Sequence, residues 1–463
     1  MQKSKLILWL ILAVVLVADV MDMLDSTITN IAAPVISQSL KGGQTLMQWL
    51  GTSYVLAMGV FLVVGGRLGD KYGQRRIFLI GLAGFTLSSL ACGLAVNPTM
   101  IIVSRLLQGS FGALLIPQGM AIMTKNFPRD MMRKAFSTFG PVISISTIAG
   151  PVVAGFLIHA NILNTGWRSI FLINLVIGLI GFIIACKTLP KDKGDKSVVL
   201  DTTGSALLGC MMFLGLYGLI SGENSEWDKK SIAMLCSGLV FFGLFVWRQL
   251  KAKNPIIKPS LFKNRGFTSG LVMGLIFFAI VAGINFVLSL FLQLGLKSSP
   301  FQAAVQLIPM SLGIIVSSVL TPGIINKIGR KIITIGLLVS LAGVLGMYFI
   351  LIMNSEITAW ILAPTIFVMG LGMGFCFGTI YDFAIGDIQH EEAGSASGTL
   401  SAVQQLSGSI GIAVISSFFF SFINTKGIVS SMQINLLIIS AALLVCIPIV
   451  GLLPKNKGEE EEH

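Results

Sequence analysis

Charged residues are scarce in this sequence. Only 11% of its 463 residues are Asp, Glu, Lys or Arg, and 54% are hydrophobic, whereas about 25% of the residues of a soluble domain are charged. This composition excludes a soluble globular protein. It indicates a polytopic membrane protein.

Residues for metal, disulfide and nucleotide chemistry are also few. The three histidines are dispersed along the chain, and none of the six cysteines forms a CxxC or another metal-binding spacing. No GxxxxGK[ST] phosphate-binding loop occurs. We therefore expect no metal site, no cofactor and no enzymatic activity, and any energy that the protein uses must come from a source other than a nucleotide.

Apolar runs of about 20 residues, the length that crosses a bilayer as a helix, recur along the chain. The first run follows Lys3 and Lys5 but is too long and too acidic for a cleavable signal sequence. The sequence thus predicts an all-α membrane protein with fourteen transmembrane helices. The runs lie near 6–28, 46–66, 77–96, 99–122, 136–159, 169–187, 202–221, 231–248, 266–294, 301–325, 332–353, 358–381, 396–423 and 432–453.

The net charge of +12 would suit a nucleic-acid partner, so the positions of the basic residues matter. If both termini are cytoplasmic, 25 of the 32 Lys and Arg residues lie on cytoplasmic segments, six lie in outer loops and one, Arg105, lies within a span. This is the positive-inside pattern of a membrane protein. We expect cytoplasmic termini, a lipid bilayer around the protein and no nucleic-acid partner.

Two predicted cytoplasmic loops share a pattern, DKYG at 70–73 after the second span and NKIG at 326–329 after the tenth. The glycine suits a tight turn with a positive φ, although a basic inner loop alone would also account for the likeness. Parallel repeats of six helices are a known transporter architecture, but here the echo is eight helices apart. We therefore expect two six-helix bundles, a linker that carries the seventh and eighth spans, and a cytoplasmic tail. The expected boundaries are 1–190 and 266–454 for the bundles, 191–265 for the linker and 455–463 for the tail.

Five segments of the N-terminal half combine polar and small residues at set places on the predicted helices. They are Leu24–Pro34 on the first span, Gly66–Arg76 after the second, Arg105–Ala113 on the fourth, Gly150–Gly155 on the fifth and Gly166–Asn174 at the start of the sixth. In this order they resemble the motifs of the fourteen-helix drug/proton antiporters of the major facilitator superfamily. Within that family, the chain looks similar to the Nor-type quinolone and multidrug exporters of staphylococci.

The resemblance implies that the loop after the second span is a cytoplasmic gate motif in which Asp70 latches one half of the protein to the other. By its position alone, Asp70 is also suited to cap a helix N-terminus or to bond basic neighbours. Position 326 of the second loop is Asn, which puts a symmetrical charged latch in doubt. The residues that match the gate motif are Gly66, Asp70, Lys71, Gly73, Arg75 and Arg76.

The fifth predicted span carries Gly150, Pro151 and Gly155. Proline kinks a helix, and small residues let neighbouring helices approach closely, so packing alone would account for these residues. The resemblance implies a further role, in which this helix shapes the transport cavity and resists leak. It also implies an antiporter and not an uptake protein.

Three acids, Asp19, Asp22 and Asp25, interrupt the first apolar run. Each carboxylate would cost about 2.5–3.5 kcal/mol at the centre of a bilayer. At a spacing of three residues they lie within an arc of about 120° and about 9 Å of helix length, so we expect them to face a cavity or a bundle interior. A carboxyl held away from water can keep a proton at neutral pH and exchange it for a cation. The alternative is polar bonding between helices, which suits Asp19 best.

Arg105 lies within a span and needs a partner there. The candidates are the acids of the first span, Gln108 and backbone carbonyls. If Arg105 pairs with Asp22 or Asp25 in one conformation and releases it in another, protonation is coupled to conformation. The family resemblance also associates this arginine with proton coupling, and a structural hydrogen-bond hub is the alternative.

Asp382, at the end of the twelfth span, either lines the inner mouth of the cavity or lies in interfacial water.

Together these features predict a monomeric exporter in a bacterial plasma membrane. It would exchange protons for amphipathic or cationic drugs, such as fluoroquinolones and quaternary ammonium dyes, by alternating access. Its partners would be these small molecules, protons and lipid, and its energy would come from the proton gradient. Two other classes remain open, namely a transporter of a physiological metabolite, lipid or nutrient, and a membrane sensor or channel that transports nothing.

Overall fold

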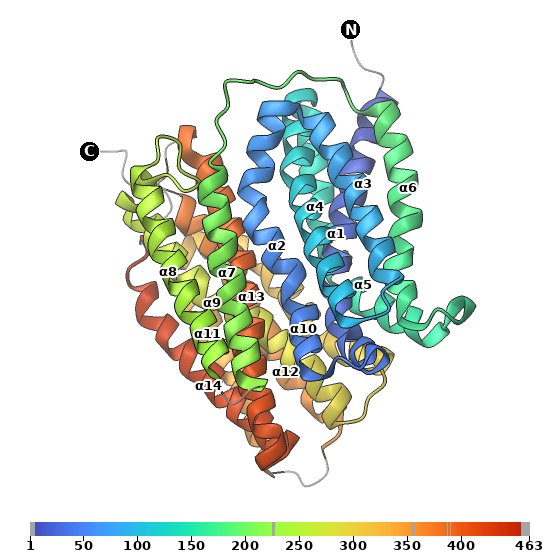
Figure 1. Cartoon of the computed structure of the whole chain (residues 1–463). Coiled ribbons are helices and arrows are strands. Elements are labelled where there is room, and N and C mark those ends of the chain that lie inside the picture. Colours follow the sequence, from blue (N-terminus) through green and yellow to red (C-terminus); the bar gives the residue numbers. More distant parts are fainter. Residues whose placement is uncertain (1–4, 225–226, 354–356, 387, 389, 455–463) are drawn as a thin grey trace. The chain divides into compact units, whose positions relative to one another are not determined.

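The computed structural model describes residues 5–224, 227–353, 357–386, 388 and 390–454. In these ranges the chain forms fourteen α-helices and no strand (Figure 1), which confirms the predicted all-α class and the predicted number of helices. The helices are α1 (Lys5–Leu40), α2 (Gly43–Tyr72), α3 (Gln74–Gly93), α4 (Pro98–Asn126), α5 (Arg129–Ala160), α6 (Ser169–Thr188), α7 (Thr202–Asn224), α8 (Lys229–Lys251), α9 (Arg265–Leu290), α10 (Pro300–Ile328), α11 (Lys331–Met353), α12 (Ala359–Ile385), α13 (His390–Lys426) and α14 (Ile428–Val450). Short helical turns accompany them at η1 (Ile162–Asn164), η2 (Gly166–Arg168), η3 (Pro259–Lys263) and η4 (Phe291–Gly295).

By length and composition, thirteen of the described helices are suited to cross a membrane. The described part of α5 adds a shorter apolar segment, Ala149–Ala160. Several helices are longer than the apolar runs that predicted them, and α1 continues to Leu40 although its run ends near residue 28. An apolar run reports the thickness of the hydrocarbon core, whereas backbone hydrogen bonds continue a helix beyond that core.

The chain divides into two compact units, Met1–Gly209 and Cys210–His463, with the boundary inside α7. Helices α1 to α6 belong wholly to the first unit, and α8 to α14 belong to the second. This division does not test the expected boundaries of the two bundles, 1–190 and 266–454, or of the linker between them. These boundaries remain predictions. The tail expected at 455–463 lies outside the described residues.

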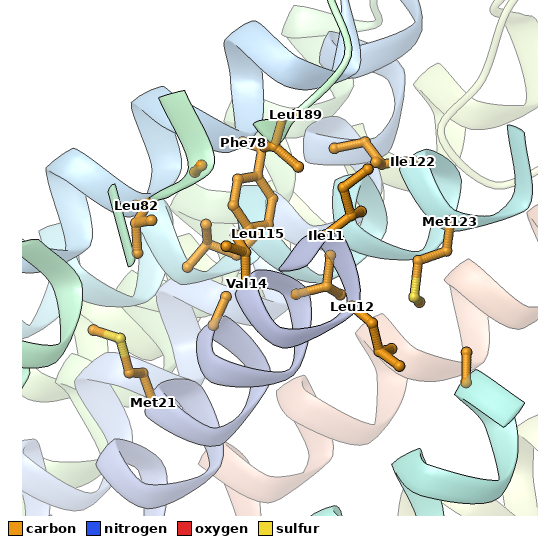
Figure 2. Close-up of a cluster of buried hydrophobic side chains, with 14 of the residues drawn as sticks. Ile11, Leu12, Val14, Met21, Phe78, Leu82, Leu115, Ile122, Met123 and Leu189 are labelled. Atoms are coloured by element: carbon orange, nitrogen blue, oxygen red, sulfur yellow. The ribbon is translucent and has the colours of Figure 1, made fainter. Parts of the chain in front are cut away.

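In the first unit, α1 packs against α2, α4, α5 and α6. The first half of α1 contributes Ile11 and Val14 to a cluster of buried apolar side chains that also includes Phe78 of α3 and Leu115 of α4 (Figure 2). Lipid tails are as apolar as these side chains, so the cluster stabilises the unit by close packing and not by removal from water. It fixes α1 directly before its acidic residues, which begin at Asp19.

Glycines bring the backbones of α2 and α4 into contact. A Cβ atom on Gly109 of α4 would lie 2.2 Å from the carbonyl oxygen of Tyr54, and one on Gly65 of α2 would lie 2.4 Å from the carbonyl oxygen of Ala113. No side chain larger than hydrogen fits at such distances without a shift of the backbone. The close approach holds the polar middle of α2 against α4.

In the second unit, α9 packs against α12, α13 and α14, and α12 also packs against α10 and α11. Glycines again allow close approach, because a Cβ atom on Gly370 would lie 2.0 Å from the carbonyl oxygen of Met310. A Cβ atom on Gly411 would lie 2.0 Å from the carbonyl oxygen of Ala279. Both units therefore use the same packing device that is typical of membrane helices.

The two loops with a shared pattern contain turns with positive φ at the predicted glycines, 96° at Gly73 and 54° at Gly329. The expectation that glycine permits these turns is confirmed. The second turn is anchored by Arg330, whose guanidinium donates to the carbonyl oxygens of Gly451 (2.8 Å) and Leu453 after the end of α14. A cation is favoured at that position because the last carbonyls of a helix carry partial negative charge.

We predict that Gly109→Ala lowers the stability of the protein by about 1–3 kcal/mol or more, because the added methyl group meets a backbone oxygen that cannot turn away. Gly243→Ala on the exposed side of α8 is the matched control, since a Cβ atom there has no neighbour within 4 Å. Apparent melting temperatures of the two purified variants in detergent would test this. Equal melting temperatures would contradict the close contact of α2 and α4.

Candidate functional site

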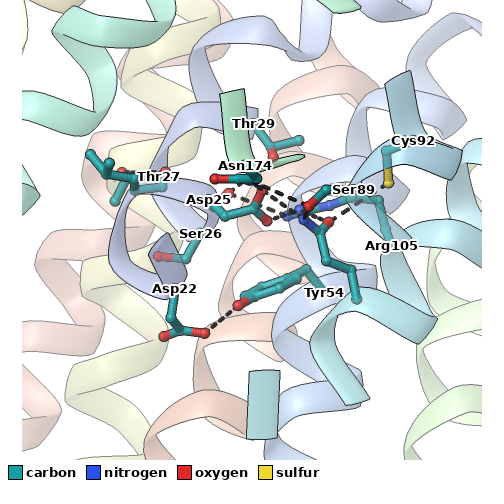
Figure 3. Close-up of polar contacts among 12 residues, drawn as sticks. Asp22, Asp25, Ser26, Thr27, Thr29, Tyr54, Ser89, Cys92, Arg105 and Asn174 are labelled. Atoms are coloured by element: carbon teal, nitrogen blue, oxygen red, sulfur yellow. Dashed lines mark hydrogen bonds and ion pairs between the residues drawn. The ribbon is translucent and has the colours of Figure 1, made fainter. Parts of the chain in front are cut away.

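Asp25 is the centre of a buried polar network in the first unit (Figure 3). Its Oδ2 atom accepts a hydrogen bond from the guanidinium of Arg105 on α4, and the two side chains form an ion pair. Its Oδ1 atom accepts from Nε2 of Gln108 on α4 (2.8 Å) and from Nδ2 of Asn174 on α6 (2.9 Å). The hydroxyl of Ser89 on α3 accepts from the same two amides, at 2.6 and 3.4 Å. The network thus joins α1, α3, α4 and α6.

Arg105 is 1% exposed and is held on several sides. Besides Asp25, it donates to Oε1 of Gln108 (2.8 Å), and a second guanidinium nitrogen lies 3.5 Å from the carbonyl oxygen of Asp25. Its planar head lies over the ring of Tyr54 at 4.4 Å and over that of Phe171 at 5.8 Å. All three kinds of partner expected from the sequence, namely an acid of the first span, Gln108 and a backbone carbonyl, contact this arginine.

Asp22 has different surroundings, although it is also 1% exposed. Its Oδ1 atom accepts a hydrogen bond from the hydroxyl of Tyr54 on α2 (Figure 3). Within the part of the chain that the structure describes, its Oδ2 atom has no hydrogen-bond partner. A buried ionised oxygen without a partner is costly, so this carboxyl is suited to bind a proton or an external cation.

Asp19 lies about one turn before Asp22 and is 9% exposed. All three acids therefore lie on the buried side of α1, as their spacing predicted. Among the described side chains of α1 to α6, these three carboxyls share their interior with one buried cation, that of Arg105. If every group were ionised, two negative charges would remain without a counter-charge in surroundings of low dielectric. Protons or cationic ligands would restore the balance.

The glycine and proline motif on α5 packs against α1 near this network. A Cβ atom on Gly150 would lie 2.1 Å from Oγ1 of Thr27, two residues after Asp25. Gly155 is buried and Pro151 is partly buried, and α5 continues as a helix through both. The motif therefore brings α5 close to the acidic stretch of α1, which is the close helix approach expected of small residues.

The predicted gate motif occupies the end of α2, the following turn and the start of α3. Its first members lie in the last turns of α2, where the side chain of Asp70 is exposed, and Arg75 and Arg76 begin α3. The carboxylate that caps α3 belongs to Asp192, which follows α6 and accepts from the backbone nitrogens of Gln74 (2.5 Å) and Arg75 (3.1 Å). An anion is favoured at a helix N-terminus, and no local pattern in the sequence predicts that Asp192 supplies it.

The segment 191–195 lies against the gate motif along its length. The backbone nitrogen of Asp195 donates to the carbonyl oxygen of Asp70 (2.7 Å), and a Cβ atom on Gly194 would lie 2.2 Å from the carbonyl oxygen of Lys71. The guanidinium of Arg75 donates to the carbonyl oxygen of Cys186 near the end of α6 (2.7 Å). The turn at Gly73 is therefore fixed by chain that is more than a hundred residues away in the sequence.

Asp382 lies in the second unit, near the end of α12, and its side chain is exposed. It takes no part in the network around Asp25, which consists wholly of residues of the first unit. The neighbouring Tyr381 donates its hydroxyl to Oε1 of Gln404 on α13. Among the residues that the structure describes, no group of three or more His, Cys, Asp or Glu side chains is arranged to hold a metal ion.

Two further members of the network were not predicted as site residues, namely Tyr54 and Ser89, and Asn174 appeared only as the end of a motif. Asn174 carries the amide in an otherwise apolar run, and Tyr54 places a phenol in the middle of the second span. A polar group that interrupts a transmembrane run is a signal of interhelical bonding. The sequence does not show which of many such groups meet, because they come from separate helices.

Comparison with known proteins agrees with this architecture. Residues 15–412 match the family model of the Major Facilitator Superfamily. The chain is 39% identical to a probable actinorhodin transporter of Streptomyces coelicolor over 430 residues, which are 91% of this chain and 74% of the relative. It is 31% identical over 411 residues to a tetracenomycin C resistance and export protein of Streptomyces glaucescens, covering 88% of this chain and 75% of the relative. Its fold is similar to the crystal structure of an auto-inhibited peptide transporter of the POT family, with a TM-score of 0.72, 13% identity and coverage of 98% of this chain and 99% of the other.

The chain therefore belongs to the Major Facilitator Superfamily. It is a transport protein of the bacterial plasma membrane with many membrane-spanning helices, and it is not an enzyme. The superfamily resemblance, the non-enzymatic class and the localisation expected from the sequence are confirmed. Its relatives are named for transport of actinorhodin, for resistance to and export of tetracenomycin C and, in Bacillus subtilis, for resistance to methylenomycin A.

We predict that Asp192→Ala lowers stability by about 1 kcal/mol or less, because α3 loses a carboxylate that caps its first turn at an exposed position. Asp195→Ala is the matched control, because that carboxylate accepts a local hydrogen bond from the backbone nitrogen of Ser197 (2.9 Å) in the same loop. Melting curves in detergent would compare them. An equal or larger loss in Asp195→Ala would contradict the capping role of Asp192.

Proposed function

We propose that this protein is a proton-coupled multidrug efflux antiporter. The observation that carries the proposal is the charge balance of the first unit, in which Asp19, Asp22 and Asp25 are buried with Arg105 as their buried cation. Such an interior is stable when protons or cations make up the difference in charge. A protein whose interior needs either a proton or a cation can exchange one for the other.

The exchange follows from simple competition. A carboxylate that pairs with a cationic drug releases its proton, and a carboxyl that takes up a proton releases the drug. If the cavity opens alternately to either side of the membrane, protons enter from the outside and drugs leave from the cytoplasm. We infer that both termini are cytoplasmic, because the basic residues then lie mainly on the inner loops.

The proposed substrates are amphipathic or cationic compounds, including quinolones and quaternary ammonium dyes. The relatives named for tetracenomycin C export and for actinorhodin transport support the export of small-molecule drugs in general. The charge balance favours substrates that carry a positive charge. The alternative among transporters is a protein that carries a physiological metabolite, lipid or nutrient. The alternative outside transport is a membrane sensor or channel.

Ethidium uptake into inverted membrane vesicles with an acidic interior would test the proposal. We expect uptake that depends on the pH gradient and stops when a proton ionophore collapses it. Asp25→Asn should reduce the rate about tenfold or more. A tenfold effect corresponds to about 1.4 kcal/mol, and removal of one partner of a buried ion pair costs about 3–5 kcal/mol.

Asp195→Asn, which changes an exposed acid of the same unit, should transport ethidium like the wild type. Ethidium binding to the purified protein should also strengthen as the pH rises, because the ionised carboxylate binds the cation and the protonated carboxyl does not. Uptake that continues without a gradient, or an unaffected Asp25→Asn variant, would exclude proton coupling through this site. If the pH gradient drives the transport of a metabolite, lipid or nutrient but not of ethidium, the alternative transporter function is favoured.

A further inference from the structure

Tyr54 connects the two parts of the buried site. Its hydroxyl donates to Oδ1 of Asp22, and its ring supports the guanidinium of Arg105 at 4.4 Å. The side chain is 0% exposed, and its ring also meets that of Phe85 edge to face, with the centroids 6.4 Å apart. One rigid aromatic group therefore contacts an acid of α1 through its polar tip and the Arg105–Asp25 ion pair through its face.

The two acids that flank this tyrosine are not equivalent. The carboxylate of Asp25 is bonded on both oxygens, by Arg105, Gln108 and Asn174, so a proton that binds there neutralises the ion pair and weakens these charge-assisted hydrogen bonds. Asp22 has one donor, Tyr54, and its Oδ2 atom is open within the described residues. A proton can bind to that oxygen without the loss of any hydrogen bond.

We propose that Asp22 is the carboxyl that exchanges the proton and that Tyr54 is the positioning residue that couples it to the Arg105–Asp25 ion pair. This inference rests on the proposed antiport. A proton from outer water forms an O–H bond with Oδ2 of Asp22, and the same proton later leaves to the cytoplasm. The phenol keeps its own proton throughout. Its hydroxyl donates to Oδ1 of the carboxylate and continues to donate to the same atom when Oδ2 is protonated, because Oδ1 is then the carbonyl oxygen of the carboxyl group.

The surroundings of Asp22 are consistent with this division of roles. The titratable and charged groups that face it are Asp19 and Asp25 on α1, Tyr54 on α2 and Arg105 on α4. The titratable side chains described on α5 and α6 are exposed, namely Lys134, His159, Cys186 and Lys187. Of these neighbours, Tyr54 supplies the hydrogen bond to the carboxylate of Asp22.

Gly112 of α4 gives this hydrogen bond its space. A Cβ atom at that position would lie 2.9 Å from the hydroxyl oxygen of Tyr54 and 3.1 Å from Oδ1 of Asp22. Both distances are shorter than an ordinary contact of a methyl group. Gly112→Ala therefore disturbs the same hydrogen bond as Tyr54→Phe, without a change in either bonded residue.

The test measures ethidium binding to the purified full-length protein by fluorescence as a function of pH. Tyr54→Phe removes the donor that stabilises the ionised carboxylate and keeps the ring under Arg105. We expect the midpoint of the pH dependence to move about 1–2 pH units higher, the effect of one hydrogen bond to a charged group. Ethidium binding at high pH should be retained. Tyr348→Phe, a partly buried tyrosine of α11 in the second unit, should keep the wild-type midpoint.

Two further variants protect the test against a folding defect. Gly112→Ala should shift the midpoint in the same direction as Tyr54→Phe. Asp22→Asn should abolish the pH dependence of ethidium binding. Adding Tyr54→Phe to Asp22→Asn should leave ethidium binding unchanged across the pH range, because the effects of residues that act through one group are not additive. Tyr54→Leu, which also removes the ring, should in addition weaken ethidium binding at high pH.

The outcomes separate this inference from the proposed function. If the wild type binds ethidium with a pH dependence and Tyr54→Phe keeps the same midpoint, the role of Tyr54 is wrong and the antiport proposal stands. If Asp22→Asn keeps the pH dependence and Asp25→Asn loses it, Asp25 is the exchanging acid and the assignment to Asp22 is overturned. If the wild type shows no pH dependence, both proposals fail together.

Discussion

The ion pair between Asp25 and Arg105 is the constraint on which the first unit depends. Neither charge is tolerable alone in a bilayer, so α1 and α4 must meet at one register, and Gln108, Asn174 and Ser89 must supply the remaining hydrogen bonds. Small residues make this meeting possible. Gly109 lets α4 touch α2, and Gly150 lets α5 touch α1.

The site contains three buried acids, whereas the ion pair with Arg105 needs only one. One carboxylate is sufficient to neutralise Arg105, and Asp25 does so with every oxygen bonded. Among the described side chains of the first unit, no second buried cation balances the charge that Asp22 and Asp19 add. A purely structural network would be more stable without them. In the proposed antiport, protons and cationic substrates balance this excess negative charge.

The two loops with a shared pattern are anchored by different residues in the two units. Both turns use a glycine with a positive φ. In the first, the carboxylate of Asp192 caps the start of α3, and in the second, the guanidinium of Arg330 bonds the carbonyls after α14. Each charge matches the partial charge of the helix end that it meets. The pattern of the loops is therefore repeated, whereas their anchoring is not.

The sequence by itself determined the helical class, the number of helices, the glycine turns and the identity of the acids and the arginine as candidates. These properties follow from local periodicity and from the cost of charge in an apolar run. Tertiary structure alone decided which acid pairs with Arg105, that Tyr54 bonds Asp22, and that Asp192 caps α3 from 118 residues away. Such contacts depend on the rotation and register of helices that are far apart in the sequence. No local pattern of residues therefore predicts them.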